Sequence, residues 1–169
     1  MRGTQARATS GTLALAALWL ACASGPTLRN GVYRDRAQGW SIAAPPPEWK
    51  RVAVDGADLA FRGPSGASIA VASRCDVAVV PLDVLAGQLR QGFGAGSVLA
   101  ERDVAIAGRP ARLQVLALAG GGRVTTVTRA AAPCVQDFVL VAPSGADDAA
   151  AGVFEAWWAS FAPASEATR

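Results

Sequence analysis

Four strand-like stretches follow one another in the second half of the chain, and they constrain the fold more than any other feature. They cover about residues 98–106, 111–118, 123–129 and 135–142. They are connected by Gly108-Arg109-Pro110, Gly120-Gly121-Gly122 and Ala132-Pro133. Such sequences are typical of hairpins and short loops. Because strands joined by short connections usually pair with each other, the sequence predicts an antiparallel meander.

The rest of the chain alternates between short strands and helical spacing. Further strands are predicted at about Trp40–Ala44, Val52–Val54, Leu59–Arg62 and Ser68–Ser73. Two segments instead place apolar residues three or four positions apart, which predicts helices over Pro81–Phe93 and Asp147–Phe161. The expected fold class is therefore α+β: an antiparallel β-sheet of about 6–8 short strands with two main helices packed on it.

The N-terminus has the layout of an export signal. Arg2 and Arg7 precede the apolar stretch Thr12–Leu20, and small residues follow it. The stretch is too short to span a bilayer, which takes about 20 residues. These features predict that the protein is exported.

Trp19-Leu20-Ala21-Cys22 followed by Ala23-Ser24-Gly25 resembles the lipobox of bacterial lipoproteins. The resemblance implies a signal peptide over residues 1–21 and a lipid anchor on Cys22. The absence of aspartate after Cys22 favours, by the same resemblance, the outer membrane, facing the periplasm. The alternative is an ordinary signal peptidase site at Ala21-Cys22-Ala23, which would release a soluble periplasmic or secreted protein.

The two remaining cysteines, Cys75 and Cys134, are expected to form a disulfide, because an exported protein matures in an oxidising compartment. Closing a loop of about 59 residues contributes about 4 kcal/mol on the chain-entropy model. Two unpaired structural thiols are the alternative. A metal site is not expected, since the chain has no histidine and two isolated cysteines are not a ligand set.

The sequence divides into a tether over residues 22–30, a single domain over 31–162 and a short tail over 163–169.

Lys and Arg number 16 and Asp and Glu 13, and the leader holds two of the basic residues and no acidic one, so the rest is nearly neutral. Its arginines are scattered and Lys50 is the only lysine. Nucleic acid is therefore not an expected partner, because phosphate binding needs clustered basic residues. No cofactor is expected either.

Four segments resemble the PsbP-like α/β/α sandwich over about residues 38–162. They are Gly39-Trp40-Ser41-Ile42, Pro47-Glu48-Trp49, Val104–Ala111 and Val153–Phe161. That family includes photosystem extrinsic subunits, a Ran-binding import factor and many small bacterial lipoproteins. The resemblance implies a non-enzymatic role in binding or assembly, although fold alone does not define function. Together with the leader, the absence of a catalytic residue set leads us to expect an unknown envelope protein or small ligand as the partner.

Few residues suggest catalysis. The absence of histidine excludes Ser-His-Asp and Cys-His mechanisms, which need a base that titrates near neutral pH. Glu101 and Asp103 lie two apart, so on a strand they share a face and could form an acid–base pair or a calcium site. We expect instead a solvated face beside Arg102. A carboxylate-dependent hydrolase and a carrier of small apolar ligands remain as alternatives to a binding or assembly domain.

Trp157 and Trp158 are neighbours on the second predicted helix. Successive helical residues diverge by about 100°. We therefore expect Trp157 to be in the core and Trp158 to lie partly exposed at the edge of the apolar arc. An exposed tryptophan is a common interface anchor, which makes Trp158 a candidate binding surface. Trp158 could instead cover the rim of the core.

Overall fold

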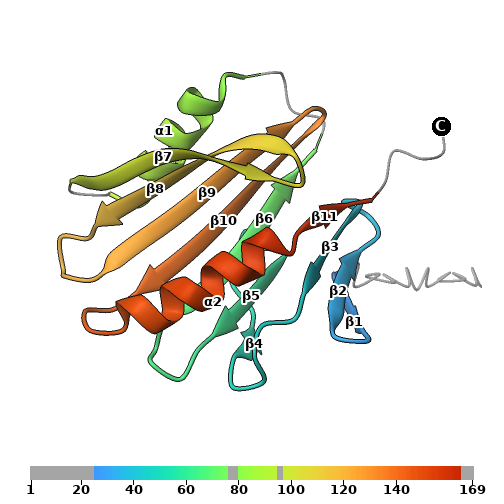
Figure 1. Ribbon diagram of the computed structural model, residues 1–169, viewed down its shortest axis with the longest axis horizontal. Coiled ribbons are helices and arrows are strands. Elements are labelled where there is room, and N and C mark those ends of the chain that lie inside the picture. The colour runs from blue at the N-terminus through green and yellow to red at the C-terminus, as the bar shows by residue number, and fades with distance from the viewer. Residues whose placement is uncertain (1–24, 76–79, 95–96, 165–169) are drawn as a thin grey trace, which may run out of the picture.

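The structure is a computed structural model that describes residues 25–75, 80–94 and 97–164. The predicted signal peptide and Cys22 lie outside these residues. Figure 1 shows the elements in chain order. They are β1 (Thr27–Arg29), β2 (Val32–Asp35), β3 (Trp40–Ala43), β4 (Lys50–Val52), β5 (Leu59–Arg62), β6 (Ser68–Arg74), α1 (Leu82–Gly92), β7 (Val98–Ile106), β8 (Arg109–Ala117), β9 (Arg123–Ala131), β10 (Cys134–Ala142), α2 (Asp147–Ala159) and β11 (Ala162–Pro163).

The strands form two sheets. One has seven strands in the order β4-β5-β6-β10-β9-β8-β7, and the other has four in the order β1-β2-β3-β11. All neighbouring strands with a described register run antiparallel. The predicted meander is confirmed as β7 to β10. The predicted fold class, an antiparallel sheet with two helices, is also confirmed.

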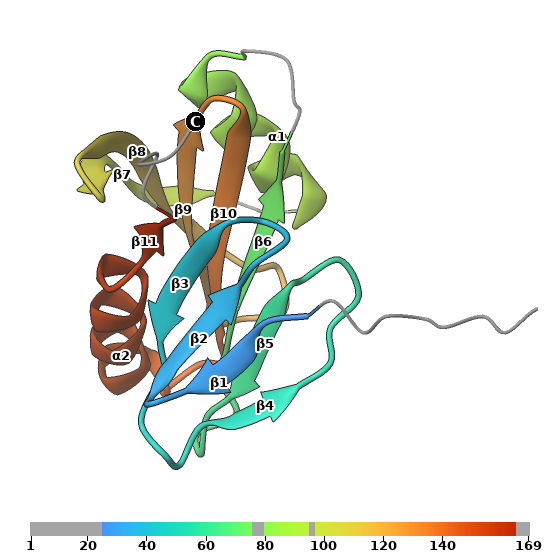
Figure 2. The ribbon, with the colours of Figure 1, turned by 90° about the vertical axis from the view of Figure 1, so that its right-hand side faces the viewer.

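The seven-stranded sheet is covered differently on its two faces (Figures 1 and 2). On one face α2 contacts β10 and also β3 of the small sheet, whereas α1 contacts β8 and β9. Side chains alternate between faces along a strand. Phe138 of β10 therefore points to the α2 side, and its neighbour Asp137 points to the opposite side. The result is three layers, with the large sheet in the middle.

A row of aromatic rings forms the core beneath α2. Tyr33 and Phe61 have ring centroids 5.4 Å apart, and Phe61 lies 6.0 Å from Trp157. Phe138 lies 6.3 Å from Trp157 and 5.3 Å from Phe161. These four contacts are all edge-to-face, the arrangement that aromatic pairs prefer. They connect β2, β5, β10 and α2 in one apolar cluster.

The domain is wider than the sequence predicted. The predicted tether contains β1, which pairs with β2, and the predicted tail contributes Pro163, which pairs with Trp40. Strand pairing therefore continues beyond the predicted bounds at residues 31 and 162. The predicted strand Val52–Val54 was misplaced as well, because β4 ends at Val52.

The expected partial exposure of Trp158 was wrong. Trp158 is 6% exposed and Trp157 is 3% exposed, and both belong to the main core cluster. The reason is that α2 contacts strands of two sheets, β10 and β3. A helix covered on two sides buries a wider arc than a helix lying on one sheet, so neighbouring residues about 100° apart can both be buried. Trp158 therefore offers no exposed ring for an interface.

Candidate functional site

A pocket of about 980 Å³ opens at one end of the large sheet. The β7–β8 and β9–β10 hairpins, the β2–β3 connection and the segment after α2 all contribute to it. Its polar lining residues include Arg109, Arg129, Gln38 and Gln136, and Phe161 adds an aromatic ring. Most of the remaining wall consists of alanine, proline and glycine. The pocket thus combines a few polar side chains with small apolar walls, as ligand sites commonly do.

Arg129 is the most deeply placed charge of this pocket, with 3% of its surface exposed. Its Nε donates to the carbonyl oxygen of Ile106 at 3.2 Å, and its Nη1 donates to Oε1 of Gln136 at 2.6 Å. The guanidinium carbon lies 5.4 Å from the centre of the Phe161 ring, a cation–π contact. All three partners are neutral, so Arg129 is held in place without an ion pair to any described residue.

Burial is the main influence on the pKa of Arg129. It lowers the pKa of the guanidinium from its ordinary value, and the nearby charge of Arg109 lowers this pKa further. Arginine nevertheless stays protonated in proteins because its ordinary pKa is so high. Buried charges are normally paired, so a positive, incompletely compensated group lines this pocket.

Strand register explains why these side chains converge. Arg129 pairs with Gln136 of β10 on one side and with Ala111 of β8 on the other. Arg109 lies two residues before Ala111 and therefore faces the same side of the sheet. The two-residue turn Ala107-Gly108, with positive φ at both positions, brings the chain directly from Ile106 to Arg109.

The wall opposite the hairpins is fixed by the end of α2. The Ser160 hydroxyl donates to the carbonyl of Trp157 at 2.6 Å and accepts from the backbone N–H of Ala43 at 3.0 Å. Two residues beyond Ala162, the N–H of Ala164 donates to the carbonyl of Gly39 at 2.6 Å. These bonds hold Phe161 and the residues that follow it against the pocket.

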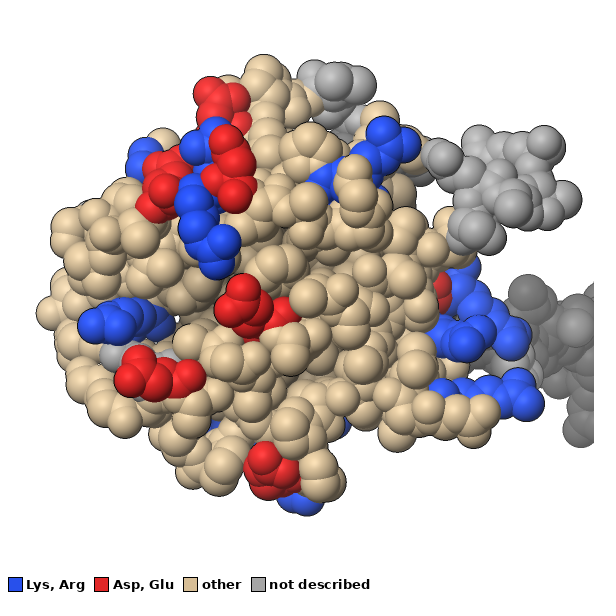
Figure 3. Space-filling model, in the orientation of Figure 1, with Lys and Arg blue, Asp and Glu red and all other residues tan. Residues whose placement is uncertain are grey.

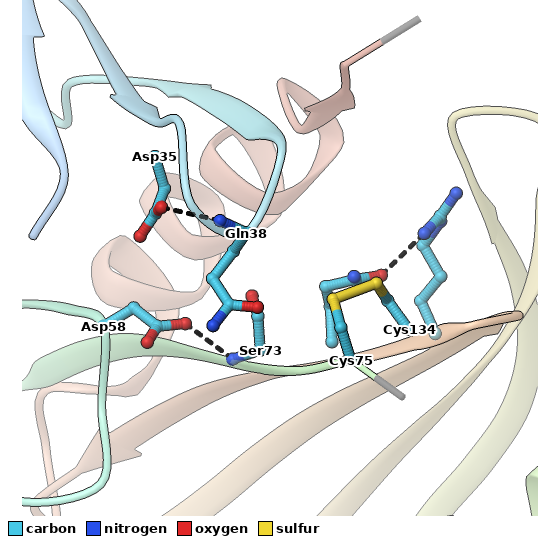
Figure 4. Close-up of a disulfide and its surroundings, with 8 residues drawn as sticks. Asp35, Gln38, Asp58, Ser73, Cys75 and Cys134 are labelled. Atoms are coloured by element: carbon cyan, nitrogen blue, oxygen red, sulfur yellow. Dashed lines mark hydrogen bonds between the residues drawn. A yellow bond between two sulfur atoms is a disulfide. The ribbon is translucent and has the colours of Figure 1, made fainter. Parts of the chain in front are cut away.

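The predicted disulfide is confirmed: Cys75 and Cys134 are bonded with an S–S distance of 2.05 Å. Cys134 also lines the pocket. Figure 4 shows Gln38 between this disulfide and the two carboxylates of Asp35 and Asp58. The disulfide therefore joins β6 to β10 beside the pocket mouth.

Asp35 and Asp58 have structural partners. Asp35 Oδ1 accepts from the N–H of Gln38 at 2.9 Å, and Asp58 Oδ2 accepts from the N–H of Ser73 at 2.6 Å (Figure 4). Burial raises the pKa of Asp58, the hydrogen bonds from Ser73 oppose this shift, and the charge of Asp35 adds to it. Both carboxylates anchor backbone, one in the β2–β3 connection and one at β6.

Glu101 and Asp103, the carboxylates that the sequence offered for acid–base or calcium chemistry, share a face of β7 but are bridged by Arg112. Its Nη1 lies 2.9 Å from Glu101 Oε1, and its Nε lies 3.0 Å from Asp103 Oδ1. On the face seen in Figure 3, side chains of both charges lie interleaved near the edge where β7 and β8 run. No group of three potential metal ligands occurs in the described part of the chain.

Asp137 lies on the opposite face of the sheet from the pocket. Its Oδ1 accepts from the Thr128 hydroxyl at 2.9 Å, and its Oδ2 lies 3.1 Å from Nη2 of Arg74. Burial raises the pKa of this carboxyl, and the contacts with Thr128 and Arg74 reduce the shift. Arg74 is largely exposed, so solvent weakens its attraction.

Comparison with solved structures places this arrangement among known folds. Over 88% of the chain, it superposes on 98% of the cyanobacterial PsbP (CyanoP) of Synechocystis sp. PCC 6803, with a TM-score of 0.60 and 14% identity. The fold is PsbP-like. A protein of Bacteroides thetaiotaomicron VPI-5482 is also similar, with a TM-score of 0.52 and 14% identity over 78% of this chain and 47% of the other. No protein-family model and no curated protein sequence matches the chain.

The helices of the PsbP-like domain are short. In the part of the chain that the structure describes, neither α1 nor α2 has the length and hydrophobicity of a membrane-spanning helix. At 14% identity the likeness to the cyanobacterial protein concerns fold alone. The function has to be argued from the site itself.

Arg109, Arg129 and Gln136 were not predicted as site residues from the sequence. One signal was available: along β9, Val127 and Arg129 share a face, so an arginine follows a core position in the alternating pattern. Using that signal requires the register of three strands, which the sequence does not provide.

Proposed function

We propose that this chain is an exported, lipid-anchored protein of the bacterial envelope, whose PsbP-like domain binds another envelope component without catalysing a reaction. The anchor is Cys22, on the strength of the lipobox-like sequence. The Cys75–Cys134 disulfide supports export, because structural disulfides are formed in oxidising compartments. The observation that carries the binding role is the pocket lined by Arg129, a buried cation with neutral protein partners only.

The residues of the pocket favour binding over catalysis. Arginine and glutamine side chains hold or orient a ligand, but neither exchanges protons near neutral pH. The described lining residues include no carboxylate. Glu101 and Asp103, which the hydrolase alternative would use, are bridged by Arg112 and do not line this pocket.

The carrier of an entirely apolar ligand fits this pocket less well. An apolar molecule would displace water from the exposed Arg109 and from the small exposed part of Arg129 without offering either a hydrogen bond, and burying unsatisfied charged groups is costly. A ligand with a polar, negatively charged end avoids this cost. The binding partner is therefore expected to present such a group.

The anchor is tested by labelling cells with palmitate. Label should appear on the wild-type protein and disappear in Cys22→Ser, and the mature protein should fractionate with the outer membrane, as Ala23 after the cysteine favours. Equal labelling of both proteins, or a soluble wild-type protein, would contradict the proposed anchor.

The binding role is tested with a photo-crosslinking amino acid in intact cells. Placed at Ala164, an exposed residue that lines the pocket, it should capture a partner. Placed at Val84, an exposed residue of α1 on the other side of the sheet, it should not capture the same partner. Capture must also be lost in Arg109→Ala. Equal capture from both positions would contradict a partner at the pocket.

A further inference from the structure

We propose that the pocket binds an oxyanion, a carboxylate or phosphate group joined to a small apolar body, with Arg129 as its inner contact and Arg109 as its outer contact. This inference rests on the proposed binding function and names the chemistry of its ligand. It concerns the pocket alone and does not depend on the lipid anchor.

Arg129 has hydrogen-bonding capacity that its protein partners do not use. A guanidinium has five N–H donors. Nε uses its hydrogen on the Ile106 carbonyl and Nη1 uses one on Gln136, while Nη2 has no hydrogen bond to any residue of the described chain. Nη2 thus remains available to a ligand, and a group that accepts from an arginine fork most strongly is an oxyanion.

The local charge is positive. Arg109 and Arg129 line the same pocket, and the charge of Arg109 contributes to lowering the pKa of Arg129. Two like charges repel each other unless an anion lies between them, so the pair alone is unfavourable and becomes favourable once an anion is bound. Because the inner guanidinium is largely removed from water, its attraction for an anion is screened less than that of an exposed arginine.

The remaining walls of the pocket indicate the chemistry of the rest of the ligand. Next to the arginines, the walls are formed by Ala130, Ala131, Pro110 and Pro163, with the Phe161 ring behind them. Such walls offer contact area and few hydrogen-bond donors. A bare inorganic ion would leave most of the pocket to water, whereas a ligand with an apolar body of several carbons would also gain from burial, at about 0.8 kcal/mol per CH₂ group.

The test is calorimetric titration of the full exported protein with four matched probes: hexanoate, hexyl phosphate, 1-hexanol and hexylammonium. Hexanoate or hexyl phosphate should bind at least about tenfold more tightly than hexanol, because charge-assisted hydrogen bonds are the stronger kind. Hexylammonium should not bind. A tenfold preference between the two anions identifies the head group, and equal binding is the result expected if only the shared oxyanion chemistry is recognised.

Variants assign the binding to the pocket. Arg109→Ala should weaken binding of the preferred anion about tenfold, whereas Arg62→Ala, which removes an exposed arginine of β5 outside the pocket, should leave it unchanged. Arg129→Lys keeps the charge and removes the planar fork, and its binding should also fall at least about tenfold. Its folding is checked by thermal unfolding, and Arg109→Ala provides the decisive result if the lysine variant does not fold.

The proposal is overturned if hexanol binds as tightly as the anions, if no anion binds, or if the Arg109 and Arg62 variants lose affinity equally. Such results leave the palmitate labelling and crosslinking of the proposed function untouched. If the protein is not labelled by palmitate and captures no partner, but still binds hexanoate through Arg109, the proposed function is rejected and the anion-binding pocket stands.

Discussion

The surface beneath α2 has two halves that are made by the same strands and have opposite character. In the aromatic half, Phe138 of β10 lies beside Val127 of β9. Two residues along, in the arginine half, Gln136 lies beside Arg129. Phe161 belongs to both, since its ring contacts Phe138 and lies below the Arg129 guanidinium. On the same face of these strands, the core and the candidate site are therefore only two residues apart.

The contrast between the two halves indicates how a small domain can keep a buried charge. Removing a cation from water costs free energy that neutral partners offset only in part. A tightly packed aromatic cluster next to it provides stability that the arginine half does not. Sites that break the rules of packing are typical places for function. The following predictions test whether stability and binding are separated between the two halves in this way.

The largest effect is expected for Trp157→Ala, in the centre of the aromatic half. Trp157 contacts both Phe61 and Phe138, and truncating a core aromatic residue costs about 3–5 kcal/mol. Urea unfolding measures the loss, with Trp157→Phe as a milder control. A loss below about 1 kcal/mol would mean that stability does not reside in this half.

Trp158→Ala should also destabilise the domain, by about 3 kcal/mol, because Trp158 is buried between α2 and its two neighbouring sheets. The same urea titration measures it. If the loss stayed below about 1 kcal/mol, the exposed position expected from helical spacing would be correct after all.

Asp137 lies on the opposite face of β10 from both halves. Its pKa is raised above the ordinary 3.8, so between the two values the folded state holds a proton that the unfolded state has lost. This carboxyl therefore makes the protein more stable as the pH falls through its folded pKa toward 3.8. Below 3.8 its contribution is constant.

Asp137→Asn should remove part of that gain in stability, measured as the free energy of unfolding between pH 7 and pH 4. Asp58, whose pKa is also raised, still contributes its own gain in stability in this variant. Anion binding at the pocket should stay as in the wild type, because Asp137 faces away from it. An unchanged pH profile would show that this carboxyl does not titrate as its burial implies.

The smallest effect on stability is expected in the arginine half. Arg129→Met keeps an apolar stem of similar length and removes the buried charge, although it also removes the side-chain donor to the Ile106 carbonyl and to Gln136. Because these terms oppose each other, we expect a change of less than about 1 kcal/mol. Hexanoate binding should nevertheless be lost. A loss of 3 kcal/mol or more would make Arg129 part of the core instead.

Much of the fold was predictable because local patterns and tertiary structure agree. The spacing of apolar residues predicted both helices, and glycine and proline connections predicted the β7–β10 meander. The first hairpin was missed although Asn30-Gly31 is a favoured turn pair, and both residues have positive φ. Its strands are short and carry charged residues, so their pattern alone did not indicate a sheet.

The site was less predictable than the fold, for a physical reason. The disulfide was predictable from two cysteines in a chain with an export-like leader, and its prediction needed no knowledge of strand register. Arg109, Arg129 and Gln136 come from three strands, and only the register brings them together. The exposure of Trp158 was wrongly predicted for a related reason, since helical spacing gives the direction of the side chain but not how many sheets surround the helix.

The separation of anion binding from the core is tested most directly by following side-chain NMR signals of both halves while hexanoate is added. The Nε–H signal of Arg129 and the amide signals of Gln136 should shift with a common dissociation constant. The indole N–H signal of Trp157, in the aromatic half, should move little. Shifts at Trp157 as large as those at Arg129, or no shift at Arg129 while hexanoate binds elsewhere, would contradict a pocket that binds anions separately from the core.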